Sequence, residues 1–171
     1  MSTQQAPGIT ATRWRIDPAD SSVEFHVKNF WKLTTVKGGF SHYHGTLDLT
    51  ADPAIELTIE ADSLDSGHEK RDKHLRSPAF FDVDNHPYVR FVSDRAILED
   101  GERLTAHGHL YARGESIPLT VEATLRPRGD DVEVEAVASA GHRALGMTFN
   151  TLGSISGTSK LIVKGRLERD S

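Results

Sequence analysis

The sequence predicts an all-β protein, an eight-stranded antiparallel up-and-down barrel with a short helical crossover around residues 66–76. Apolar and polar residues alternate along most of the chain, which is typical of strands with one buried and one exposed face. Short turn signals separate these stretches and favour antiparallel neighbours. About eight such strands suit a closed barrel, because closure leaves no exposed edge strand.

The alternating stretches indicate the strands in chain order. The first stretch places Val23, Phe25 and Val27 on one face of a strand. The same pattern returns at residues 55–60, 104–112, 117–125, 132–138 and 161–167. Turn signals lie between the stretches at residues 51–53, 99–101, 113–115 and 128–131. Residues 1–12 are small and polar, so we expect a disordered lead-in followed by a single domain over residues 13–171.

One stretch, residues 63–87, has no alternation and is heavily charged. Within it, residues 66–76 favour a short helix that ends before Pro78, since the residue before a proline is disfavoured in the helical conformation. The apolar content of this helix is essentially Leu75, so we expect the helix to lie across the barrel surface.

Composition excludes several function classes. The chain has 20 basic and 25 acidic residues, and the net charge of −5 predicts no general attraction for nucleic acid. It has no cysteine, which excludes disulfides, cysteine-bound metals and thiol nucleophiles. Phosphate-binding loops, nucleophile elbows and zinc-protease motifs are also missing, so we predict no catalytic residue. The first residues lack the pattern of a secretory leader, and no apolar run is long enough to span a membrane, so we expect a cytoplasmic location.

Several short motifs occur together in the chain. They are Trp14 to Asp17, Ser22 to Phe25, Val36 to Phe40, Arg71 to Leu75, Phe80 to Val83, His86-Pro87, Gly108 to Leu110, Ile117 to Leu119, and His142-Arg143 with Leu145 to Met147. The set resembles the YceI-like family from Trp14 to about Leu167. The resemblance implies a lipocalin-like barrel that binds a polyisoprenoid or another lipid, and it allows a homodimer. Many relatives carry a secretory leader, and this chain shows none.

The inward-facing residues predict an apolar interior, which the resemblance implies is a ligand cavity. The candidate ligand-binding residues on the strands are Phe25, Val27, Phe40, Leu57, Ile59, Phe91, Leu110, Leu119 and Val121. Phe80, Phe81 and Met147 are placed to close the mouth of the cavity. Small residues at inward positions favour a hollow interior, and these are Ala106, Gly108, Ala112, Ala123, Ala136, Ala138 and Gly165. The alternation by itself does not distinguish a hollow interior from a solid core, which small eight-stranded barrels can have.

The charged block from Arg71 to His74 allows two interpretations. In the first, Arg71 and His74 form a polar gate, together with Lys73, and contact the head group of the ligand. In the second, Asp72 caps the helix and Arg71 pairs with a neighbour, so that the block clamps the crossover onto the barrel. Both interpretations stay open, and Arg71 and His74 remain candidate ligand-binding residues.

Two pairs of histidines, His42 with His44 and His107 with His109, are spaced so that each pair lies on one face of a strand. If the two strands are neighbours, the four imidazoles suit a metal ion. However, His107 and His109 fall on the polar face of their strand, where histidines are common without any metal, so we predict no metal site. A separate feature, Phe30-Trp31, allows transient contact with a membrane surface.

We therefore predict a non-enzymatic carrier that sequesters a long isoprenoid-type lipid, either a polyprenyl phosphate or a quinone, in an apolar barrel cavity. Apart from that bound lipid, we expect no cofactor. One alternative is a metal-binding protein or metalloenzyme that uses the paired histidines. The other is a stress-response or interaction protein with a packed core and no small ligand.

Overall fold

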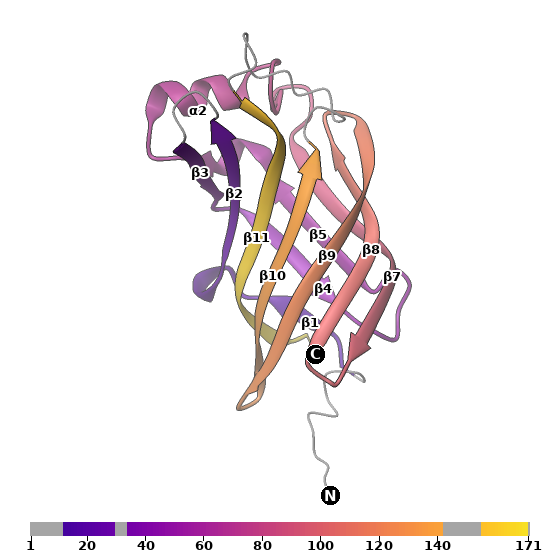
Figure 1. Ribbon diagram of the computed structural model, residues 1–171. Helices are drawn as coiled ribbons and strands as arrows, with labels where there is room; N and C mark the ends of the chain where they lie inside the picture. Colours follow the sequence, from indigo (N-terminus) through magenta and orange to yellow (C-terminus); the bar gives the residue numbers. More distant parts are fainter. Residues whose placement is uncertain (1–11, 30–33, 142–154, 171) are drawn as a thin grey trace, which may run out of the picture.

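The chain folds as a closed antiparallel barrel of eight strands, which confirms the fold class predicted from the alternation (Figure 1). The computed structural model describes residues 12–29, 34–141 and 155–170. Its strands are β1 (Trp14–Ile16), β2 (Ser22–Asn29), β3 (Thr34–Phe40), β4 (Tyr43–Leu47), β5 (Ile55–Glu60), β6 (Leu64–Asp65), β7 (Tyr88–Glu99), β8 (Arg103–Ala112), β9 (Glu115–Arg128), β10 (Asp131–Gly141) and β11 (Ile155–Arg169). Its helical elements are η1 (Pro18–Asp20), η2 (Ala61–Ser63) and α2 (Glu69–Arg76).

The barrel closes through β11, which pairs with β10 along one edge and with two strands along the other. The first part of β11 pairs with β2, and its last residues pair with β1, from Trp14↔Arg169 to Ile16↔Leu167. β1 pairs with β4, and β5, β7, β8, β9 and β10 follow as antiparallel neighbours. Because β1 and β2 share one edge of β11, they act as one interrupted strand of the barrel. The same holds for β3 with β4 and for β5 with β6, which reduces the eleven segments to eight barrel strands.

The three interrupted strands are neighbours in the barrel. Pro18 begins the 3-10 turn between β1 and β2, a position that suits proline because its φ is preset and it has no N–H to satisfy. The breaks in the other two strands are joined by a hydrogen bond from the Ser41 N–H to the Ser63 carbonyl at 3.3 Å. Beyond the breaks, β3 pairs with β6 at two positions. The crossover between β6 and β7, which carries α2, covers one end of the barrel (Figure 1).

The crossover helix α2 forms inside the range that the sequence predicts. The His68 side chain occupies the N-cap position and accepts a hydrogen bond from the Arg71 N–H at 3.4 Å. The helix ends at Ser77, directly before Pro78, as expected from the restriction that proline places on the preceding residue. Leu75 is 1% exposed and carries the apolar contact of the helix. None of the helices in the described ranges has the length and apolar character needed to span a membrane.

Candidate ligand cavity

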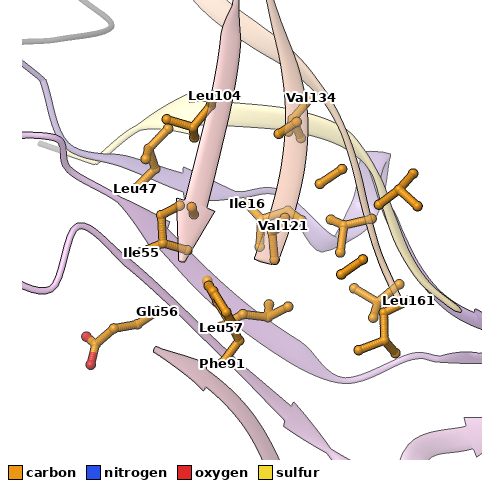
Figure 2. A pocket seen from close by; sticks show the side chains of 18 of the residues that line it. Ile16, Leu47, Ile55, Glu56, Leu57, Phe91, Leu104, Val121, Val134 and Leu161 are labelled. Atoms are coloured by element: carbon orange, nitrogen blue, oxygen red, sulfur yellow. The ribbon is translucent and has the colours of Figure 1, made fainter. Parts of the chain in front are cut away.

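An apolar cavity of about 140 Å³ lies inside the barrel (Figure 2). Side chains from β1, β2, β4, β5 and every strand from β7 to β11 line it. Figure 2 shows Ile16, Leu57 and Val121 directed into this space, whereas the carboxylate of Glu56 points away from it. The volume is close to that of an engineered apolar cavity that binds benzene. The barrel is therefore hollow at this level, and its walls present hydrocarbon.

Six of the residues predicted to bind a ligand line the cavity, namely Leu57, Ile59, Phe91, Leu110, Leu119 and Val121. The prediction missed other lining residues on the same strands and on β1, β4, β10 and β11, among them Ile16, Leu47, Ile55, Leu104, Leu125, Val134, Leu161, Val163 and Leu167. The alternation already marks several of these residues as inward-facing. What the sequence did not show is the register between strands, which determines which inward-facing residues lie at the level of the cavity. Val27 lies in β2, where it pairs with Ser159. Met147 lies outside the described residues.

Four alanines gather on one wall of the cavity. Ala136 pairs directly with Ala123, and Ala138 pairs with Val121, which in turn pairs with Ala106. Directly paired residues of neighbouring strands point to the same face, so these small side chains form one continuous surface on β8, β9 and β10. All four alanines line the cavity. Because their side chains end at Cβ, this wall leaves open space that larger residues would fill.

The two inward glycines do not leave room, so the prediction that every small inward residue opens the interior is wrong. A Cβ at Gly108 would lie 2.2 Å from the Val92 carbonyl oxygen, because the bulge in β7 brings its backbone against β8. A Cβ at Gly165 would lie 2.2 Å from the Cβ of Ser21. Both positions are glycine because neighbouring backbone occupies the space. Ala112 is buried and does not line the cavity.

Four phenylalanines form a second apolar group, the phenylalanine cluster, made of Phe25, Phe40, Phe80 and Phe81. Ring centroids lie 5.4 Å apart for Phe25–Phe40, 5.8 Å for both Phe25–Phe81 and Phe40–Phe81, and 5.0 Å for Phe80–Phe81. These spacings are typical of favourable tilted and edge-to-face contacts. A Cβ at Gly38 would lie 2.5 Å from the ring of Phe25, so that ring covers Gly38. The four rings were predicted as ligand contacts, and the structure places them together, outside the lining of the cavity.

The charged block on α2 holds the crossover together. The Asp72 carboxylate, in a residue 7% exposed, accepts hydrogen bonds from the Ser66 N–H at 2.9 Å and from the Ser66 hydroxyl. Arg71 donates through Nε to the Ser66 hydroxyl and through Nη2 to the Ser66 carbonyl, both at 2.9 Å. Arg76 donates to the Leu64 carbonyl at 2.6 Å. These contacts favour the clamp interpretation, although Asp72 holds Ser66 rather than capping the helix. Neither Arg71 nor the exposed His74 lines the cavity.

The two histidine pairs lie apart on the barrel, because β5 and β7 separate β4 from β8. The two strands are not neighbours, so the four histidines do not form a shared site. His107 contacts the Thr120 hydroxyl at 3.1 Å, and His109 contacts the Asp94 carboxylate at 2.9 Å, both on the outer face. Within the described ranges, no cluster of three histidine or acidic side chains is arranged to hold a metal ion.

Fold and cavity together define a closed antiparallel barrel with an apolar interior and a helical crossover at one end. Comparison with known proteins identifies the family to which this barrel belongs. The family model of the YceI-like domain matches residues 14–166, so the chain belongs to the YceI-like family.

Two bacterial proteins illustrate the similarity in sequence. The chain is 32% identical to Protein YceI of Salmonella newport (strain SL254) over 128 residues, which is 71% of this chain and 65% of that protein. It is 33% identical to UPF0312 protein ECA1782 of Pectobacterium atrosepticum over 114 residues, 64% of this chain and 58% of that protein. These matches span less than two thirds of the relatives' length.

Two solved structures share the fold over most of their length. BcnA of Burkholderia cenocepacia matches with a TM-score of 0.76 and 19% identity, covering 89% of this chain and 98% of that chain. A polyisoprenoid binding domain from Saccharophagus degradans, implicated in plant cell wall breakdown, matches with a TM-score of 0.72 and 11% identity, covering 94% and 99%. At these identities, the likeness shows the fold.

Proposed function

We propose that this protein is a non-enzymatic carrier that sequesters the apolar chain of an isoprenoid-type lipid, a polyprenyl phosphate or a quinone, inside the barrel. The observation that carries the proposal is the cavity, which lies inside the barrel and is lined almost entirely by apolar side chains. Membership of the YceI-like family and the fold shared with a polyisoprenoid binding domain support it. Cytoplasmic location, a homodimer and transient membrane contact remain predictions.

Burial of hydrocarbon provides the affinity. Each methylene removed from water contributes about 0.8 kcal/mol, so an isoprene unit of about five carbons contributes about 4 kcal/mol before the cost of ordering the chain. An interior without hydrogen-bonding side chains recognises such a chain by shape and lack of polarity. A polar head group therefore stays outside this cavity, at the surface of the protein or in water.

Native mass spectrometry of protein purified gently from its own host tests the proposal. We expect an added mass that organic extraction removes and that matches an isoprenoid lipid. The extracted protein should take up such a lipid again in vitro. Repeated recovery of the bare chain, together with no uptake in vitro, would contradict the carrier function.

A substitution on β9 separates binding in the cavity from binding at the surface. Ala123 lines the cavity between Leu104 and Ala136, so Ala123→Trp fills the space without adding charge. We expect this variant to lose the lipid mass. Glu122→Trp is the matched control, because it places the same ring one residue away on the exposed outer face and should keep the lipid. Equal lipid content in both folded variants would place the ligand elsewhere.

A further inference from the structure

The phenylalanine cluster ends the cavity on the side of the crossover. Phe25 pairs with Leu161, and Phe40 pairs with Val23. Leu161 and Val23 both line the cavity, whereas none of the four rings does. The rings therefore begin where the open space stops. They fill a part of the interior that in a uniformly hollow barrel would continue the cavity.

The four rings are held by different parts of the chain. Phe25 and Phe40 lie on β2 and β3, which pair with each other along their whole length. Phe80 and Phe81 lie on the crossover, where the Phe81 N–H donates to the Leu75 carbonyl at 2.9 Å and the Phe80 N–H donates to the Ser77 carbonyl at 2.9 Å. Two rings thus belong to the barrel wall, and two belong to a segment with its own internal hydrogen bonds.

Phe81 joins these two halves of the cluster. Its ring contacts Phe25 and Phe40 on the wall at 5.8 Å each, and it contacts Phe80 on the crossover at 5.0 Å. Phe81 is 8% exposed, whereas Phe80 is 1% exposed. Phe81 is therefore a crossover ring that packs directly against both wall rings.

The open space is short compared with an isoprenoid chain. A cavity of about 140 Å³ has room for a molecule of about the size of benzene, and so for roughly one isoprene unit. Towards the crossover, a longer chain has to occupy space that the rings now fill. We propose that Phe81 determines how long an apolar chain the barrel accepts, because its ring stops the cavity and a longer chain has to displace it. The inference rests on the carrier function proposed above.

Binding of a short and a long member of one chemical series tests the role of Phe81. The probes are two isoprenoid alcohols, prenol with a single isoprene unit and geranylgeraniol with a chain several units long, titrated against lipid-extracted protein. We expect Phe81→Ala to bind geranylgeraniol at least about tenfold more tightly than the unsubstituted protein, because two or more further methylenes become buried without displacing a ring. The affinity for prenol, which fits the open space, should change less than about threefold. Phe81→Trp should weaken binding of the long alcohol more than that of the short one.

Val83→Ala is the matched control. Val83 lies on the same crossover and is also 8% exposed, but it is not part of the ring cluster. If Val83→Ala changes the ratio of the two affinities as Phe81→Ala does, looser packing of the crossover is responsible and the role of Phe81 is refuted. If Phe81→Ala is poorly folded, Phe81→Leu replaces it, because leucine is smaller than phenylalanine and keeps the site apolar. The ratio of the affinities for the two alcohols then tests the role of Phe81 in the same way.

The remaining outcomes separate this inference from the carrier function. If all variants bind prenol and Phe81→Ala leaves the ratio unchanged, Phe81 does not set chain length, while the carrier function stands. If no variant binds either alcohol, the carrier function fails and the inference fails with it.

Discussion

Replacing Ala136 by leucine tests whether the interior is empty, because the result has opposite signs for a hollow and a solid barrel. Ala136 lines the cavity on β10 and is only partly buried, although its side chain points inward. Leucine adds three carbons, and burying them contributes about 2.4 kcal/mol at about 0.8 kcal/mol each. Loss of side-chain rotamer freedom removes about 0.5–1 kcal/mol. We therefore expect Ala136→Leu to raise the free energy of unfolding by about 1.5 kcal/mol.

Ala112→Leu is the matched control. Ala112 is 3% exposed, belongs to the packed core and does not line the cavity. The same added carbons have no open space there, so overpacking should lower the free energy of unfolding by about 1–3 kcal/mol. Equilibrium urea unfolding of lipid-extracted protein measures both values. If Ala136→Leu destabilises the protein as much as Ala112→Leu does, protein atoms already fill the interior, and the cavity on which the proposed function depends does not exist.

Two further substitutions test the crossover clamp and the tight approach between β7 and β8. The Asp72 carboxylate accepts two hydrogen bonds at the start of the crossover. Asp72→Ala should therefore lower the free energy of unfolding by about 2–3 kcal/mol. Asp84→Ala, at an exposed position of the same crossover, should leave the free energy of unfolding nearly unchanged. Urea unfolding distinguishes the two, and equal values would exclude the clamp. Gly108→Ala would put a Cβ 2.2 Å from a backbone oxygen and should cost more than about 2 kcal/mol or prevent folding. Gly39→Ala meets its nearest atom at 3.4 Å, so a similar loss of thermal stability there would refute the steric explanation.

Much of the fold was predictable because its signals are local. The alternation along Ile117 to Leu125 predicts which side chains face inward, and this prediction needs no knowledge of the partner strands. The same reasoning places the crossover helix before Pro78, since the restriction on the preceding residue acts within the chain. The interruptions of the first barrel strands were not predicted. They depend on contacts between segments that are distant in sequence, such as Ser41 with Ser63.

The candidate site was only partly predictable. Leu57 and Phe25 both read as inward-facing, yet Leu57 lines the cavity and Phe25 packs in the phenylalanine cluster. Sequence alone does not separate them, because the difference depends on the height of each residue along the barrel axis. At the height of Phe25, side chains from the crossover fill the interior. Small residues show the same limit. Ala123 faces open space, whereas the missing side chain at Gly108 makes room for a neighbouring backbone.

By itself, therefore, the sequence determined the class of fold, the inward set of side chains and the place of the crossover. The tertiary structure decided where inside the barrel the space is empty and where four rings fill it. The physical reason is that the direction of a side chain follows from the period of its own strand, whereas a void depends on the sizes of side chains brought together from many strands.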